Sequence, residues 1–153
     1  MKVHIINFPE TKVAALEHIG PPETEYLSIQ KFIAWRIENK YPLDKHKGYG
    51  VHYNDPKTVS PDQYQVDLCI SVDEDVAENN YGVINKIIPA GKCALVRHLG
   101  SRQNISSARY LYEEWLPKSN ESLRDFPIFF HYVNVGPNIK DDDMITDVYL
   151  PII

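Results

Sequence analysis

An internal repeat constrains the fold of this chain more than any other feature of its sequence. When the 153-residue sequence is aligned with itself at an offset of 80 residues and without gaps, residues 8–20 pair with residues 88–100. Five of these thirteen pairs are identical, namely Pro9/Pro89, Lys12/Lys92, Ala14/Ala94, His18/His98 and Gly20/Gly100. The same offset pairs Trp35 with Trp115, the only two tryptophans in the chain. Self-similarity of this kind is typical of a duplicated supersecondary unit, one copy of which cannot bury its apolar face alone.

The repeat divides the chain into residues 1–76 and 81–153, which we expect to form a single domain over residues 1–153. At this length a chain buries a hydrophobic core without disulfides or a metal. We therefore expect Cys69 and Cys93, which lie in apolar runs, to pack as small buried thiols. The N-terminus lacks the apolar core of a signal peptide, and no stretch is long and apolar enough to span a membrane. We expect a cytoplasmic chain that begins at Met1 and does not bind membranes.

Each repeat predicts the element order strand, helix, strand, strand. The expected strands are residues 12–19, 48–54 and 64–72 in the first repeat and residues 92–99, 128–134 and 145–151 in the second. The first strands end at Gly20 and Gly100, where the chain is free to turn. Shorter segments, residues 3–7 and 82–88, come before them. We expect each of these to extend the first strand of its own repeat or to pair with it.

A helix is expected after the first strand of each repeat. In the second repeat one helical face is apolar and Pro117 ends it; the face consists of Ala108, Leu111, Tyr112, Trp115 and Leu116. The matching face of the first repeat consists of Ile29, Phe32, Ile33 and Ile37. The sequence thus predicts an α+β fold, a tandem duplication of a β-α-β-β unit with an antiparallel sheet, two helices on one side and a central groove with pseudo-twofold symmetry.

Charge and motif content narrow the classes of function. A net charge of −5 without a Lys/Arg cluster predicts no direct nucleic-acid binding, because phosphate binding needs concentrated positive charge. The sequence has no G-x-S-x-G motif and no phosphate-binding Gly-rich loop, and we expect no cofactor and no metal. His18 and His98 allow a catalytic or metal-binding role, although local hydrogen bonds are commoner for histidines in strands. These features favour a binding protein over an enzyme.

Four segments of the chain carry a resemblance to a known family. They are GYGVHYNDP at residues 48–56, IIPAGKCALVRHLG at 87–100, YLYEEWLP at 110–117 and TDVYLPI at 146–152. In order and spacing they resemble the GyrI-like effector-binding domains, which occur alone or at the C-terminus of AraC-type and MerR-type regulators. The resemblance covers essentially the whole chain.

The resemblance implies a pseudo-symmetric eight-stranded domain that binds hydrophobic, often cationic, small molecules in its central groove. Members of the family act as drug-sensing regulators, as protectors of DNA gyrase or as hydrolases of cyclopropane-bearing toxins. For this chain it implies a standalone protein that binds amphipathic, aromatic or cationic compounds, as a sequestering or regulatory protein. Two alternatives are a hydrolase of electrophilic toxins and an interaction protein whose partner is DNA gyrase or a transcription regulator.

One position departs from the family pattern. Members commonly carry an acidic residue in a strand written P-x-F-E-x-Y, where it meets cationic ligands. Aligning this pattern on Pro127, Phe129 and Tyr132 places Phe130 at the acid. The resemblance implies that this position faces the groove. Because strand side chains alternate, Phe130 and Tyr132 are expected to line it together.

Further candidates for the ligand site come from the repeat and from residue chemistry. The offset of 80 places Gly50 and His52 at the positions of Phe130 and Tyr132. In the last strand we choose Asp147 as the negative charge and Tyr149 as an aromatic wall, although alternation leaves open which face meets the groove. For Asp147 and its repeat equivalent Asp67, capping a turn or pairing with a Lys across strands is the alternative. The helices contribute Trp35, Trp115 and Tyr112, for which core packing is the alternative. Glu113 and Glu114 diverge around the helix, so at most one of them approaches the groove.

Overall fold

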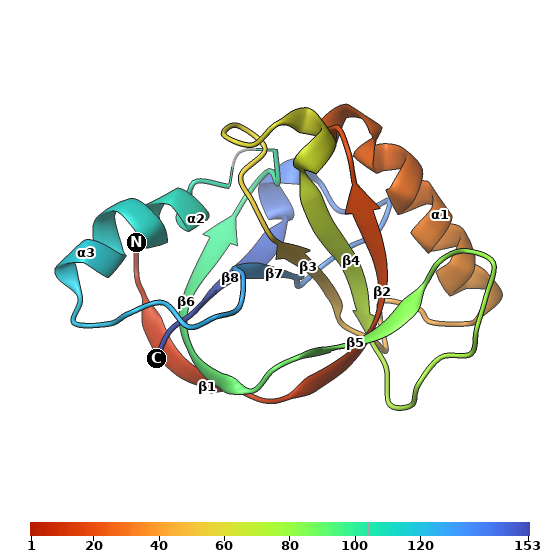
Figure 1. Ribbon diagram of the computed structural model, residues 1–153, viewed down its shortest axis with the longest axis horizontal. Coiled ribbons are helices and arrows are strands. Elements are labelled where there is room, and N and C mark those ends of the chain that lie inside the picture. Colours follow the sequence, from red (N-terminus) through yellow and green to blue (C-terminus); the bar gives the residue numbers. More distant parts are fainter. Residues whose placement is uncertain (104) are drawn as a thin grey trace. The chain divides into compact units, whose positions relative to one another are not determined.

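The computed structural model describes residues 1–103 and 105–153, which form two compact units. Unit 1 combines residues 1–10 with residues 89–153, and unit 2 consists of residues 11–88. In these residues eight antiparallel strands and two main helical segments make an α+β fold, which confirms the predicted class (Figure 1). The groove expected between the repeats stays a prediction.

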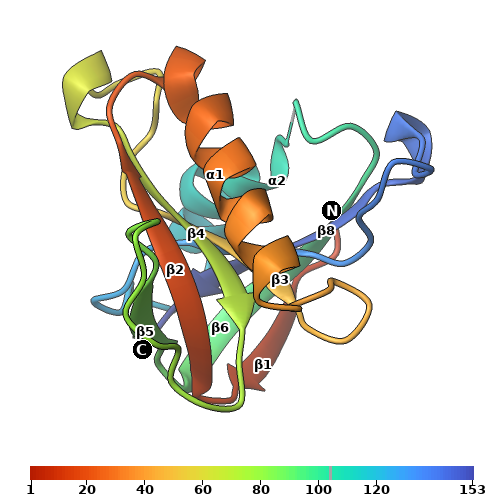
Figure 2. The ribbon, with the colours of Figure 1, turned by 90° about the vertical axis from the view of Figure 1, so that its right-hand side faces the viewer.

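Unit 2 is a four-stranded antiparallel sheet with one helix. Its strands, in spatial order, are β3 (Gly48–His52), β4 (Gln65–Ser71), β2 (Thr11–Ile19) and β5 (Ile84–Ile88). Helix α1 (Glu25–Glu38) lies over β2 and β4 (Figure 2). Two short 3-10 turns, Pro22–Thr24 and Pro61–Gln63, precede α1 and β4.

Unit 1 repeats this plan with a different helix. Its strands, in spatial order, are β1 (His4–Phe8), β6 (Gly91–Leu99), β8 (Ile145–Pro151) and β7 (Phe129–Tyr132). The helical segment is continuous and consists of α2 (Ser107–Tyr110), a π-helical turn (Leu111–Trp115) and α3 (Leu116–Lys118). A 3-10 turn, Asp141–Asp143, precedes β8. The helix continues one residue past Pro117, which stands in the first turn of α3, where a missing N–H is tolerated.

The leading strands do not pair within their own repeats, contrary to expectation. Strand β1 pairs with β6, and strand β5 pairs with β2. Only two residues separate each leading strand from the next, and the first of them is Pro9 or Pro89. The common two-residue hairpin turns require a positive φ at this position, whereas proline fixes φ near −65°. A tight hairpin is therefore excluded, and each leading strand belongs to the unit built mainly from the other repeat.

The core of unit 2 lies between α1 and the sheet. Its buried members are Ala14, Leu16, Phe32, Trp35, Leu68, Ile70, Val72 and Val83. Trp35 is only 2% exposed, and its ring stacks on both Phe32 and Tyr41, with centroid distances of 5.9 and 5.2 Å and interplanar angles of 10° and 13°. Trp35 is thus a core residue.

The predicted buried face of α1 is wrong except at Phe32. Ile29, Ile33 and Ile37 are 38%, 40% and 73% exposed. The helix instead turns Trp35 into the core, because the larger indole removes more apolar surface from water than an isoleucine does. An apolar stripe of isoleucines therefore remains on the outer side of α1.

The core of unit 1 has the same location but different helix residues. It contains Ala94, Val96, Leu111, Ile128, Val148, Leu150 and Ile152, with Trp115 and Phe130 packed against it and partly buried. Cys69 and Cys93 are buried free thiols in their strands, as expected. In the described part of the chain, no helix is long and apolar enough to cross a membrane.

The two equivalent tryptophans should differ in their effect on stability. Replacing Trp35 by Ala should lower the free energy of unfolding by about 3–5 kcal/mol, as for other buried aromatic truncations. Trp115→Ala should cost less, because Trp115 is only partly buried. Urea unfolding followed by circular dichroism measures both losses. Equal losses would contradict the assignment of Trp35 alone to the core.

Candidate functional site

The strand register places the expected site residues of unit 1 on two faces of the sheet. In the pairing of β7 with β8, Phe130 lies opposite Val148 and Phe129 lies opposite Tyr149. Directly opposed residues project to the same side of a sheet. Phe130 and Tyr132 therefore share the face that packs under the helix, while Asp147 and Tyr149 lie on the other face.

Asp147 is held by an internal cation. It is 6% exposed, and its two oxygens accept hydrogen bonds from Arg97, with Oδ1 2.8 Å from Nε and Oδ2 3.1 Å from Nη2. Hydrogen bonding to Asp147, followed by charge attraction, raises the pKa of Arg97. A cationic ligand at Asp147 would have to compete with this bidentate pair.

The aromatic side chains near the expected site are also engaged. Tyr149 stacks on Phe129, with a centroid distance of 4.9 Å and an interplanar angle of 6°, and meets the edge of Phe8 at 5.2 Å. Burial, followed by the charge of Asp147, raises the pKa of Tyr149 to about 12. Its phenol is therefore neutral at pH 7.

The guanidinium group of Arg102 lies over the ring of Tyr132. The guanidinium carbon of Arg102 lies 5.2 Å from the ring centroid. Arg102 is fixed there because Nε donates to Thr146 Oγ1 at 2.8 Å and Nη2 donates to the carbonyl oxygens of Asn134 and Ile145 at 2.8 and 2.7 Å. A ligand cation on this ring face would have to displace Arg102.

In unit 2 the equivalent carboxylate uses different partners. Asp67 corresponds to Asp147, and its Oδ2 accepts hydrogen bonds from Tyr53 Oη at 2.6 Å and from Lys86 Nζ at 2.8 Å. Lys86 also binds Glu17 at 2.8 Å. Burial alone lowers the pKa of Lys86, but its bonds to the two carboxylates raise it overall. A Lys partner for Asp67 was one of the alternatives from the sequence, and Lys86 takes that role. Tyr53, Arg97 and Arg102 were not expected.

The histidines have structural or buried positions. His18 Nε2 lies 3.2 Å from the carbonyl oxygen of Pro21, and His98 Nε2 lies 2.9 Å from the carbonyl oxygen of Ser101, which confirms the local bonding expected for strand histidines. Burial lowers the pKa of His52 to about 4. His52 is therefore neutral at pH 7.

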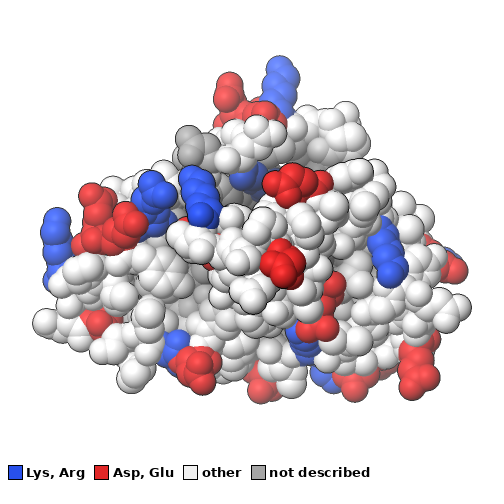
Figure 3. All heavy atoms as spheres, turned by 45° about the horizontal axis from the view of Figure 1, so that its top comes forward, with Lys and Arg blue, Asp and Glu red and all other residues white. Residues whose placement is uncertain are grey.

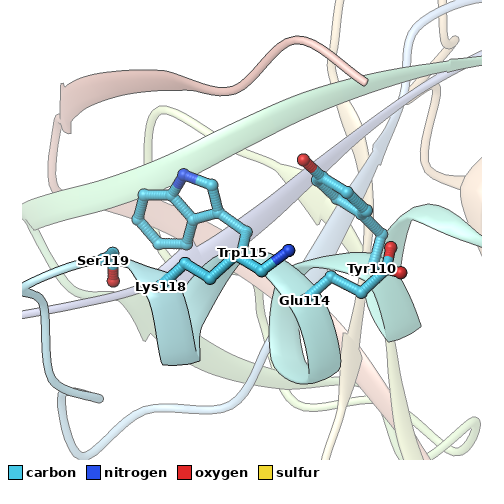
Figure 4. Close-up of a pocket in the computed structure, with 5 residues that line it drawn as sticks. All are labelled: Tyr110, Glu114, Trp115, Lys118 and Ser119. Carbon is cyan, nitrogen blue, oxygen red and sulfur yellow. The ribbon is translucent and has the colours of Figure 1, made fainter.

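A pocket in unit 1 surrounds one of the expected residues. It has a volume of about 210 Å³ and is lined by Tyr110, Glu114, Trp115, Lys118 and Ser119. In Figure 4 the rings of Tyr110 and Trp115 rise from the same side of the helix, and Glu114 and Lys118 extend along it. An electron-rich ring beside a carboxylate and an ammonium group can bind an aromatic molecule that carries charge.

Tyr110 reaches this pocket because of the π-helical turn. Residues five apart diverge by about 140° on a regular α-helix, where each residue turns by about 100°. In a π turn the hydrogen bonds run from residue i to i+5, so Tyr110 and Trp115 stand one turn apart on one side. The apolar pattern of the sequence did not predict this π-helical turn. Tyr112, the expected helix residue, is 40% exposed and lies outside the lining.

Charge on the molecular surface is mixed. On the face that Figure 3 shows, Lys and Arg side chains are interspersed with Asp and Glu. An exposed ion pair on the pocket helix follows the same pattern, since Arg109 Nε lies 3.9 Å from Glu113 Oε1. Short-range contacts therefore matter more at the pocket than a long-range field of one sign.

Comparison with known proteins shows matches over the full length of the chain. The profile of the GyrI-like small molecule binding domain matches residues 1–153. The "Probable transcriptional regulator YgiV" of Escherichia coli (strain K12) is 38% identical over 154 residues, which cover 99% of this chain and 96% of that protein.

Solved structures share the fold at low identity. The EcmrR C-terminal domain has a TM-score of 0.76 at 17% identity, over 99% of this chain and 97% of that one. SAV2435 bound to tetraphenylphosphonium has a TM-score of 0.59 at 10% identity, over 100% of this chain and 94% of that one.

The cation that holds Asp67 should be essential for stability. Lys86→Met leaves a carboxylate with a 2% exposed side chain without its charge partner, and loss of one member of a buried pair costs about 3–5 kcal/mol. Arg97→Met should cost less, because the side chain of Asp147 is 9% exposed. Chemical unfolding of both variants at pH 7 compares them. If Lys86→Met leaves the free energy of unfolding unchanged, Asp67 does not need Lys86 as its charge partner.

His52 should make the protein less stable in acid. Its pKa is about 4 when folded and about 6.5 when unfolded, so the unfolded state binds a proton more tightly. The stability contributed by neutral His52 is complete above about pH 6.5 and is lost as the pH falls towards 4, on the order of 1–3 kcal/mol. Urea unfolding at pH 7 and pH 4.5 should show a smaller pH effect for His52→Gln than for the wild type. Identical pH effects would rule out His52 as the titrating group.

Proposed function

This chain belongs to the GyrI-like family of small-molecule-binding domains, and we propose that it binds amphipathic compounds that carry an aromatic or cationic group. The observation that carries this proposal is the family match over residues 1–153. It is supported by the pocket beside Trp115, where aromatic rings and a carboxylate occur together. Ring faces attract cations by about 0.5–2 kcal/mol, depending on how much water is removed.

The relatives support the same class of ligand and a regulatory role. SAV2435 was solved with tetraphenylphosphonium, a cation made of aromatic rings. The similarity to a protein described as a probable transcriptional regulator extends over nearly the whole length of both chains. We infer that ligand binding by this chain serves regulation or sequestration, and that the compound is returned unchanged.

Glu114 is the better candidate for the negative charge at the site. Asp147 is neutralised by the bidentate contact with Arg97, whereas Glu114 is exposed on the wall of the pocket. Among the residues expected from the sequence, Trp115 lines this pocket. We therefore propose Trp115 as the aromatic wall and Glu114 as the group that prefers cations.

Binding should be detectable as a rise in melting temperature. We expect stabilisation by aromatic cations such as tetraphenylphosphonium and rhodamine dyes, because a ligand that binds only the folded state shifts the unfolding equilibrium. Glu114→Gln should weaken binding of cations about 3- to 10-fold, corresponding to about 0.7–1.4 kcal/mol, and should affect neutral aromatics less. Asp147→Asn serves as the matched control and should leave the preference for cations unchanged.

Three results would contradict parts of this proposal. If no cationic or neutral aromatic compound shifts the melting temperature, the chain is not a binder of this class. Equal weakening of cations and neutral compounds by Glu114→Gln removes Glu114 as the charge. Mass spectrometry of the recovered compounds tests the enzymatic alternative, since a hydrolase would convert them.

A further inference from the structure

The chain itself shows what fits beside the buried tryptophan of the first repeat. Tyr41 lies on Trp35 with a centroid distance of 5.2 Å and an interplanar angle of 13°. It is held there by its backbone, which donates from N–H to the Arg36 carbonyl oxygen at 2.9 Å, and by the edge of His46 at 5.1 Å. A planar ring of the protein thus occupies the site next to this indole.

The second repeat lacks this ring. The offset of 80 places Glu121 at the position of Tyr41, and the carboxylate of Glu121 is bound to Lys92 Nζ at 2.8 and 3.0 Å. Trp115, the equivalent of Trp35, lines a pocket of about 210 Å³ instead. The chain thus stacks a ring of its own on Trp35, whereas Trp115 lines a pocket.

Three further positions differ between the helices of the two repeats. Gln30, Ala34 and Glu38 of α1 correspond to Tyr110, Glu114 and Lys118 in the second repeat. The π-helical turn brings Tyr110 beside Trp115, whereas the corresponding part of α1 is a regular helix. Wide turns of this kind occur frequently at functional sites. The tryptophan of the second helix thus has a second ring, a carboxylate and an ammonium group around it.

We propose that the pocket beside Trp115 binds one planar aromatic ring, stacked on the indole as Tyr41 is stacked on Trp35, in a ligand that carries both an amino and an acidic group. The ammonium group of the ligand meets Glu114, and its carboxylate meets Lys118. The volume of about 210 Å³ is below the ~300–1,000 Å³ of typical drug sites, so the pocket has room for a single small ring system. This inference rests on the proposed small-molecule binding and specifies its ligand.

Four indole compounds test the ligand class with one ring in four charge states. Tryptophan is a zwitterion, tryptamine a cation, indole-3-propionate an anion and indole neutral. Two-dimensional NMR resolves the indole N–H signals of Trp35 and Trp115, the only tryptophans of the chain. We expect the compounds to shift the Trp115 signal and not the Trp35 signal, and tryptophan to bind most tightly. Glu114→Gln should remove its advantage over indole-3-propionate, and Lys118→Met its advantage over tryptamine.

The pocket can also be filled from within the chain. Glu121→Tyr introduces the ring that Tyr41 supplies in the first repeat, and we expect it to weaken tryptophan binding at least 10-fold. Glu121→Gln is the matched control, because it also removes the charge that binds Lys92 without filling the pocket; binding should stay within about two-fold of the wild type. Trp115→Leu provides a second test if Glu121→Tyr does not fold. Because this variant lacks the Trp115 signal, its binding is measured by isothermal titration calorimetry, and tryptophan binding should be abolished.

The outcomes separate this inference from the broader proposal. Unchanged binding in Glu121→Tyr or Trp115→Leu, or a shift of Trp35 rather than Trp115, overturns the pocket assignment. If tetraphenylphosphonium still stabilises the protein in that case, the proposed function survives without this site. If tryptophan binds no better than indole, the charged groups do not select the ligand and the zwitterion assignment is wrong.

Discussion

Proline at the start of each two-residue link determines how both sheets are assembled. Pro9 and Pro89 exclude a tight hairpin, so β1 and β5 do not pair with the strands that follow them in sequence. Instead β1 pairs with β6 in unit 1, and β5 pairs with β2 in unit 2. The helix of each unit packs mainly on the two central strands of its sheet, which are β2 and β4 in unit 2 and β6 and β8 in unit 1. In unit 1 Val3, next to β1, packs against the same core cluster as Trp115. The pocket helix therefore depends on residues from both ends of the chain.

The duplication conserves positions while changing their partners. Asp67 and Asp147 are equivalent and buried, yet one is held by Lys86 from a leading strand and the other by Arg97 from the neighbouring strand β6. Trp35 and Trp115 are equivalent as well, but Trp35 stacks on Phe32 and Tyr41, whereas Trp115 lines a pocket. Once a framework has two copies, one copy can keep a fully packed core while the other exposes an indole. Loss of symmetry, rather than symmetry itself, creates the chemical features of unit 1.

Much of the fold could be predicted because it depends on short-range patterns. Strand β8 has the predicted bounds, and the apolar periodicity located both helices. Strand partners could not be predicted, since side-chain alternation is the same whichever neighbour a strand has. The site was harder still, because the face on which Asp147 lies depends on the register of β7 with β8. The replacement of Tyr41 by Glu121 was visible at the offset of 80, but its meaning required the stacked geometry of Trp35.

The exchange of leading strands also affects the order in which the chain can fold. Unit 2 is a continuous segment, so all of its strands are available once residue 88 has been synthesised. Unit 1 cannot close until β6 appears, because His4 pairs with Leu95. Pairing across so long a stretch of sequence carries a high entropic cost and is formed slowly. Strand β1 is thus synthesised well before its partner β6, and until they pair it remains an unpaired strand open to incorrect association.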